Sequence, residues 1–131
     1  MQVPVLRPMP LTAQAVTHKF KVADCEVYVS VGLYEDGMPG SITITPAKKG
    51  LHFNEGLLNT ATTFIGLALQ YGVPLNDVLD KMKAQRFEPS GMTSNPGITM
   101  AASIINYIGR WMEKEFVHKM PAPHPELGLR S

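Results

Sequence analysis

Alternation of apolar and polar residues in the first third of the chain predicts an antiparallel sheet. Residues 18–22, 26–34 and 41–45 alternate and are rich in β-branched and aromatic side chains, which is typical of strands. Ala23 and Asp24 can turn the chain, and the later Asp-Gly dipeptide supplies the positive φ that a tight turn requires. The apolar face of the central strand would consist of Val27, Val29, Val31 and Leu33, opposite a face with Glu26, Tyr28, Ser30 and Tyr34.

Apolar residues then recur at spacings of three and four, which predicts helices that cover the apolar face of this sheet. The first helix would begin after a cap at Asn54 and stop at Gly72. The second would occupy residues 74–83. The third would have Asn95 as its cap and Pro96 as its first helical residue. The stripe of the first helix expected to face the sheet comprises Leu57, Leu58, Ala61, Phe64, Ile65, Ala68 and Leu69.

These elements predict one α+β domain, with a three-stranded antiparallel sheet (β-β-β) followed by about three helices packed on one face. The domain would span residues 18–116. Residues 1–17 are rich in proline and are expected to form an extended arm, and residues 117–131 return to proline as a loosely held tail. A chain of 131 residues with 44% hydrophobic residues can bury a core of this size.

The charge balance and the cysteine count exclude several functional classes. Lys+Arg 12 against Asp+Glu 11 gives a net charge of +1, so no strong field would attract nucleic acid or an anionic membrane. No apolar run approaches the roughly 20 residues that cross a bilayer, and residues 1–10 lack the pattern of a secretory signal. Cys25 is the single cysteine, which excludes an internal disulfide and a cysteine-rich zinc site and fits a cytoplasmic location.

The stretch RFEPSGMTSNPG (residues 86–97) holds more charged, small and turn-forming residues than a connection needs. Its hydroxyl residues would approach the amino end of the third helix, where free amides and a positive dipole favour anions. In the alternative, Arg86 and Glu88 pair with neighbours and brace the turn, and we favour this alternative because ordinary ion-pair networks resemble binding sites in sequence. The predicted anion or nucleotide pocket comprises Arg86, Thr93, Ser94, Lys48 and Lys49.

Other candidate chemistry is weak in this sequence. The four histidines have no metal-ligand spacing on a predicted helix, so we expect no metal site. His18 opens a predicted strand and could face a nucleotide, but a histidine at a strand start more often lies on the surface or packs against neighbours. Tyr107, Trp111 and Phe116 belong to the third helix, and aromatic residues at helical spacing pack against a core more often than they stack on a base.

Five sequence blocks carry a family resemblance over most of residues 17–116. The blocks are THKFKV (17–22), VGLYEDGMPG (31–40), LALQYGVPL (67–75), RFEPSGMT (86–93) and SIINYIGRW (103–111). In this order, they resemble the C-terminal region of adenosylcobalamin-dependent, class II ribonucleotide reductases, which is sometimes called the TSCPD domain. Agreement of several blocks in order is far more specific than any one short motif.

The resemblance implies ribonucleotide reduction by radical chemistry, with adenosylcobalamin, a thiyl radical and a reducing cysteine pair on a large barrel upstream of this region. This chain has no room for that barrel, and Cys25 alone cannot supply the radical cysteine and its redox pair. None of the family's catalytic residues transfers to this sequence, and residues 117–131 depart from the family pattern. We therefore expect that the isolated chain does not reduce nucleotides and that it holds no cofactor.

Three roles stay open at this point. In the first, the chain is an accessory or regulatory module that docks on a reductase or another protein partner. In the second, it binds a nucleotide or another phosphorylated small molecule. In the third, it is the small subunit of a split adenosylcobalamin-dependent ribonucleoside-diphosphate reductase, active only with a partner chain in deoxyribonucleotide synthesis. A domain that once packed on a barrel would expose that surface, so we also expect a homo-oligomer, as a dimer.

Overall fold

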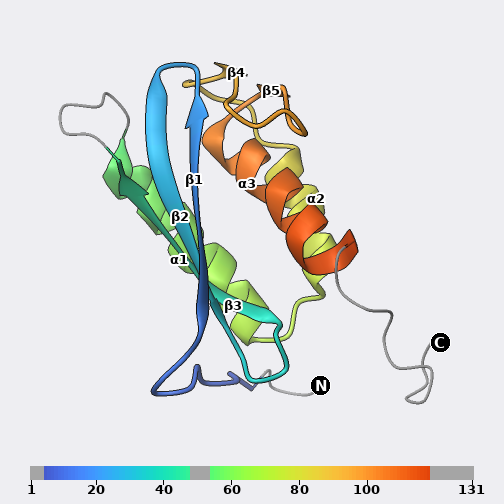
Figure 1. The fold of residues 1–131 in the computed structure, drawn as a ribbon. Helices are drawn as coiled ribbons and strands as arrows, with labels where there is room; N and C mark the ends of the chain where they lie inside the picture. Colours follow the sequence, from blue (N-terminus) through green and yellow to red (C-terminus); the bar gives the residue numbers. More distant parts are fainter. Residues whose placement is uncertain (1–4, 48–53, 119–131) are drawn as a thin grey trace.

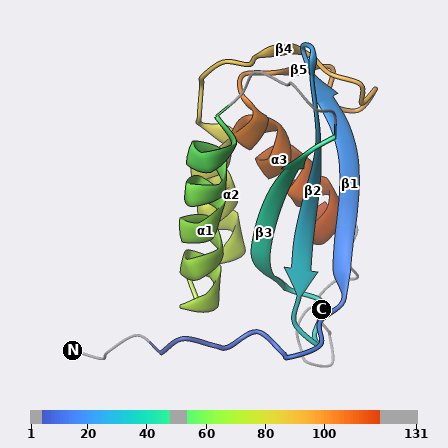
Figure 2. The ribbon, with the colours of Figure 1, turned by 90° about the vertical axis from the view of Figure 1, so that its left-hand side faces the viewer.

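The computed structural model describes residues 5–47 and 54–118, which form a sheet with helices on one of its faces (Figures 1 and 2). The strand order is β1-β2-β3, and both pairs are antiparallel. The strands of this sheet are β1 (Ala15–Val22), β2 (Cys25–Leu33) and β3 (Pro39–Pro46). The later elements are α1 (Glu55–Gln70), α2 (Leu75–Lys83), the short strands β4 (Gly91–Met92) and β5 (Met100–Ala101), α3 (Ile104–Met112) and the π-helical η1 (Glu113–His118). The predicted α+β fold, with three strands followed by three helices, is confirmed.

The buried face of the central strand is the apolar face that the alternation predicted, with one exception at the end of the strand. Val27, Val29 and Val31 have no exposed surface, and they pack in one core with residues of α2 and α3. The β2–β3 register shifts between Gly32 and Leu33. Such a shift changes which residues face inward, and Tyr34, which the strict alternation placed on the polar face, is buried.

The first helix packs along the outer edge of the sheet as well as on its face. The side chain of Asn59 accepts from the Ile44 amide and donates to the Ile44 carbonyl, both at 3.1 Å, as a neighbouring strand would. The side chain of Gln70 donates to the carbonyl of Gly40 at 2.8 Å. Gly66 faces the same edge, and a Cβ atom there would lie 3.5 Å from the Gly40 carbonyl oxygen, an ordinary contact distance. Side chains of α1 therefore satisfy backbone groups at two positions on the outer edge of β3.

The second and third helices are joined by a close backbone approach at Gly109. A Cβ atom on Gly109 would lie 2.9 Å from Cβ of Met82 and 3.3 Å from the backbone nitrogen of Lys83. The side chain of Asn106 donates to the carbonyl of Lys83 at 2.7 Å, and Ser103 Oγ donates to the carbonyl of Gln85 at 2.9 Å. These contacts fix the end of α2 against the start of α3.

We expect Gly109→Ala to lower the free energy of unfolding by about 1–3 kcal/mol, because the new methyl group overpacks this contact. The loss should appear although alanine favours a helix over glycine by about 1 kcal/mol. Gly66→Ala is the matched control, since its Cβ would lie at ordinary contact distances, 3.5 Å from the nearest atoms. Urea unfolding followed by circular dichroism measures both, and equal effects of the two substitutions would contradict the close approach.

The start of the third helix was predicted wrongly. The helix begins at Ile104, and Ser103 is its cap, with Oγ accepting from the Asn106 amide at 2.8 Å. Asn95 instead opens a turn in which the Ile98 amide donates to the Asn95 carbonyl at 3.0 Å. Proline followed by glycine fits the centre of a turn, so the chain reverses there and β5 pairs with β4. The Asn-Pro signal thus marked a hairpin turn.

Both ends of the predicted domain extend further into the flanking segments. Strand β1 begins at Ala15, three residues before the predicted start at His18. Before β1, Arg7 contacts Tyr34 in the connection between β2 and β3. The Arg7 guanidinium lies 3.7 Å from the centre of the Tyr34 ring, and the Arg7 carbonyl accepts a hydrogen bond from the Tyr34 hydroxyl at 2.7 Å. At the other end, η1 includes Val117, which packs against the core. The remainder of the predicted tail lies outside the described residues.

Candidate functional site

An apolar groove of about 840 Å³ lies between α1 and α2. One wall is α1, the other is α2, and the connection after α2 closes one end. Several of the lining side chains are large and exposed, with exposed fractions of 67% for Leu57, 63% for Phe64, 41% for Val73 and 39% for Phe87. Leu57 and Phe64, which were predicted to face the sheet, are thus exposed to solvent in this groove.

The groove exists because the two helices pack on different parts of the fold. Helix α1 is held on β3, with Leu58, Thr62 and Gly66 buried on that side. Helix α2 is held on α3 through Gly109. Successive residues of a helix point about 100° apart, so Leu57 and Phe64 project from roughly the opposite side of α1 to these buried residues. The prediction that Leu57 and Phe64 face the sheet was wrong, and the groove is lined by this second apolar side of α1.

Polar side chains of the groove carry charges of both signs. They comprise Asn54, Asp77, Lys81, Gln85 and Glu88. The side chain of Asn54 caps α1 by accepting from the Leu57 amide at 2.9 Å. One lysine beside two carboxylates makes a poor anion site, whereas the apolar walls suit apolar side chains of a partner.

Two hydroxyl residues of the predicted anion pocket form hydrogen bonds with the backbone of the fold. The Thr93 hydroxyl donates to the carbonyl of Ile98 and accepts from the Asn95 amide at 3.0 Å. Ser94 Oγ accepts from the Lys21 amide at 3.0 Å, so both hydroxyls hold the loop in place. Arg86 is exposed. Lys48 and Lys49 lie outside the described residues.

Glu88, two residues after Arg86 in the chain, forms a hydrogen bond within the loop. The Glu88 carboxylate accepts from the Ser90 hydroxyl at 2.8 Å, and the Glu88-Pro89 peptide bond is cis. This hydrogen bond agrees with the Glu88 part of the bracing interpretation, and the role of Arg86, as a brace or as an anion ligand, stays a prediction.

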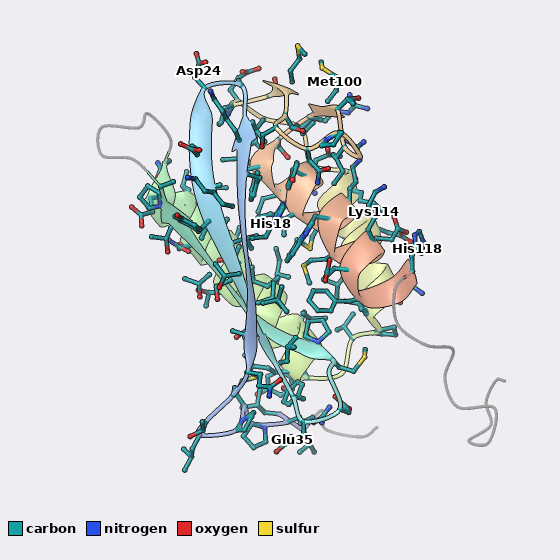
Figure 3. All side chains as sticks on the ribbon, viewed as in Figure 1. His18, Asp24, Glu35, Met100, Lys114 and His118 are labelled. Carbon is teal, nitrogen blue, oxygen red and sulfur yellow. The ribbon has the colours of Figure 1, made fainter. Side chains whose placement is uncertain are left out.

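An aromatic cluster connects β1, the turn at Asn95 and α3. Figure 3 shows His18 directed from β1 toward α3, where its ring stacks on that of Trp111 with centroids 4.8 Å apart. Its Nε2 lies 2.8 Å from the Tyr107 hydroxyl, which also accepts from the Asn95 side chain at 3.0 Å. The ring of Phe20 stacks on that of Tyr107 with centroids 4.0 Å apart. The predicted packing role of Tyr107 and Trp111 is confirmed, since both are buried.

The cluster predicts a pH dependence of stability. Burial lowers the pKa of His18 below its ordinary value of 6.5, although the charge of Glu115 opposes this shift. Above pH 6.5 the imidazole is neutral in both states. As the pH falls below 6.5, the unfolded chain binds the proton first, so the free energy of unfolding should fall until folded His18 is protonated as well.

Urea unfolding between pH 5 and 8 measures this effect. We expect His18→Phe, which keeps the ring stacking, to flatten the dependence in that window. His118→Gln serves as the control, because His118 is exposed at the end of η1 and should leave the dependence unchanged. An unaltered slope in His18→Phe would show that His18 is not the group responsible.

Other chemistry-bearing groups do not assemble in the described part of the chain. Cys25 is a buried free thiol, and burial raises its pKa, which disfavours the reactive thiolate. Within residues 5–47 and 54–118, no three histidine, cysteine, aspartate or glutamate side chains are grouped to hold a metal ion. No helix in these residues is long and apolar enough to span a bilayer.

Comparison with known proteins now adds the family. Residues 4–116 match the model of the TSCPD domain. The chain belongs to the TSCPD domain family. The match includes α1, α2 and the residues that line the groove, so the groove is formed by the matched part of the chain.

Curated relatives of this TSCPD domain are named vitamin B12-dependent ribonucleotide reductase. The chain is 45% identical over 109 residues to the protein from Rhodopirellula baltica and 34% identical over 117 residues to that from Bradyrhizobium diazoefficiens. These alignments cover 83% and 88% of this chain but 10% and 9% of the relatives. The protein from Streptomyces avermitilis is 33% identical over 114 residues, 87% of this chain and 12% of the relative. No solved structure matches the chain.

The resemblance to class II reductases is therefore confirmed at the level of the family. The chain spans about a tenth of the length of the curated relatives that it matches. The groove is the part of the site that sequence reasoning missed. Its signal was visible as neighbouring apolar pairs on the first helix, such as Leu57 with Leu58 and Phe64 with Ile65, which make the apolar arc wider than one sheet contact requires.

Proposed function

We propose that this TSCPD domain is a non-catalytic accessory or regulatory module that docks on the polypeptide of a vitamin B12-dependent ribonucleotide reductase. The groove between α1 and α2 is the observation that carries the proposal. Large exposed apolar patches are typical of surfaces that bind another protein. The relatives, which are about ten times longer than the matched region, supply the class of partner.

The arrangement of potentially reactive groups supports a non-catalytic role. Cys25, the single cysteine, is buried, and the shift of its pKa disfavours the thiolate. The polar side chains around β1 and the loop 86–97 bond one another or the backbone, which stabilises the fold. These groups have structural roles, and the groove offers contact area for a partner.

The proposal is tested with a reductase polypeptide that lacks its own TSCPD region. We would delete the 109-residue matched region from the Rhodopirellula baltica protein and titrate the remainder with this domain in a calorimeter. Saturable binding is expected. Absence of binding at concentrations up to 100 µM of each protein, about the upper range of specific weak complexes, would overturn the proposal.

Reductase assays of the same mixture separate the accessory role from that of a split-enzyme subunit. If the truncated reductase is active by itself and the domain changes its rate, the domain is an accessory or regulatory module. If activity appears only when the domain is added, the domain is an essential subunit. The proposal expects the first result.

A nucleotide or phosphorylated ligand at Arg86 is tested separately. Calorimetric titration with ribonucleotides and deoxyribonucleotides would compare the unaltered domain with Arg86→Ala. Lys19→Ala removes an exposed positive charge from β1 and is the matched control. Binding weakened only by Arg86→Ala would add ligand recognition to the proposed role, and absence of binding would leave the loop as a structural brace.

A further inference from the structure

We infer that the groove between α1 and α2 binds an amphipathic helix of the reductase polypeptide. The inference rests on the proposed function and specifies which surface docks and what kind of segment it receives. It is argued from the chemistry of the groove walls, the length of the groove and the distribution of exposed apolar side chains.

Four large exposed apolar side chains lie together on this surface, Leu57, Phe64, Val73 and Phe87. Leu57 and Phe64 are about two-thirds exposed on one side of α1, and Phe87 stands at the end of the groove that follows α2. In water, each exposed ring or isobutyl group forgoes the free energy that burial would supply, about 1.5–3 kcal/mol per side chain. A partner that covers the groove gains this burial without rearranging the fold.

The walls favour a helical occupant over an extended one. Both walls are helices, whose backbone amides and carbonyls bond within the helix. An extended segment in the groove would bury backbone groups without partners, because it would find no strand edge to pair with. A helix satisfies its own backbone and presents only side chains, which is what apolar walls can accept.

The length of the groove sets the size of the helix. The α1 wall runs from Leu57 to Ala68, which corresponds to about 16 Å of helix axis. A partner helix of about three turns has this length, with apolar anchors at positions i, i+3 or i+4, and i+7. The mixed charges of Asp77, Lys81 and Glu88 along the groove favour polar residues of both signs beside the anchors.

Other occupants fit the groove less well. Among the described residues that line the groove, the phosphates of a nucleotide would meet the carboxylates of Asp77 and Glu88 and the single positive charge of Lys81. A second copy of this chain is the alternative protein occupant and agrees with the dimer expected from the sequence. The reductase polypeptide is favoured because the matched region makes up only about a tenth of the relatives, so the remaining nine-tenths can supply the segment.

Calorimetry with substituted domains tests the surface. Phe64→Glu and Leu57→Glu place a charge in the groove at exposed positions, where folding should be preserved. Met92→Glu is the matched control, because Met92 is 72% exposed on β4 and does not line the groove. With the truncated Rhodopirellula baltica reductase as the partner, we expect each groove substitution to weaken binding about 30-fold or more, as at an interface hot spot, and Met92→Glu to change it less than about threefold.

Photo-crosslinking identifies the occupant. A benzoyl-phenylalanine at position 64 should link to one reductase segment with apolar residues at helical spacing, whereas the same group at position 92 should not. Binding that is unaffected by Phe64→Glu and Leu57→Glu would overturn the groove inference while leaving the docking function intact. Crosslinks to an extended segment or to a second copy of the domain would overturn the helical reductase occupant. Absence of any complex would instead overturn the proposed function itself.

Discussion

Replacing Tyr107 by alanine is expected to lower the free energy of unfolding by about 3–5 kcal/mol, which is the cost typical of removing a large buried aromatic ring. Tyr107 has no exposed surface, stacks on Phe20 and hydrogen bonds with both His18 and Asn95. The substitution leaves a cavity between β1 and α3 and removes the partner of two polar side chains. Urea unfolding monitored by circular dichroism gives the midpoint and the slope from which the free energy follows.

Tyr107→Phe separates the contribution of the hydroxyl from that of the ring. It keeps the packing but leaves His18 and Asn95 without their shared partner, so we expect a loss of about 1–3 kcal/mol. If Tyr107→Ala cost less than about 1 kcal/mol, as surface substitutions do, the central position of this ring in the core would be contradicted.

Replacing Asn59 by alanine is expected to cost about 2–4 kcal/mol, because it removes two hydrogen bonds to one backbone position. The amide of Asn59 pairs with both the amide and the carbonyl of Ile44, a residue with only 1% of its surface exposed. Without it, the outer edge of β3 would keep unpaired groups beneath α1. The same unfolding measurement applies, and exposure of this edge should also increase aggregation, which light scattering detects.

Two further substitutions control for the change in helix propensity and for the role of the donor. Asn76→Ala alters an exposed asparagine in α2 and is expected to change stability by no more than about 0.5 kcal/mol. Asn59→Asp keeps an acceptor for the Ile44 amide but places a carboxylate oxygen against the Ile44 carbonyl, so it should destabilise despite its similar size. A harmless Asn59→Asp would show that the edge contact does not require a donor.

The proposed docking at the groove between α1 and α2 would explain why this small domain has so many apolar residues on one helix. A helix that only covered a sheet edge would need one apolar stripe, whereas α1 has a second stripe with Leu57 and Phe64. The proposed docking role accounts for that second stripe, and the internal hydrogen bonds of Thr93 and Ser94 account for the composition of the loop. In this interpretation, the loop orients α3 and the sheet, and the helices present the surface for a partner.

Much of the architecture followed from local patterns in the sequence. The alternation of Val27, Val29 and Val31 determined both the strand and its buried face, because successive residues of a strand point to opposite sides. The Asn54 cap and the Gly72 stop predicted the ends of α1 closely, since caps satisfy backbone groups through neighbouring residues. The sequence blocks also identified the family before the comparison confirmed it.

The errors fall where distant parts of the chain decide between local alternatives. Asn95 and Pro96 fit a helix start as well as a turn, and pairing between β4 and β5 selected the turn. The alternation predicted that Tyr34 lies on the polar face of the sheet. In the structure Tyr34 is buried, next to a register shift between β2 and β3 and in contact with Arg7. In both cases the local preference is worth less than the hydrogen bonds and burial that the tertiary contacts supply.

The sequence by itself determined the class of fold, the buried face of the sheet, the first two helices and the family. Only the tertiary structure decided which apolar residues meet solvent, because α1 packs on β3, α2 packs on α3, and the space between them depends on both contacts. Periodicity shows that Leu57 and Phe64 are apolar positions on a helix, but it contains no information on whether a second helix closes over them. The groove arises because the hydrogen bonds of Asn59 and Gln70 hold α1 to the edge of β3, whereas the close approach at Gly109 holds α2 to α3.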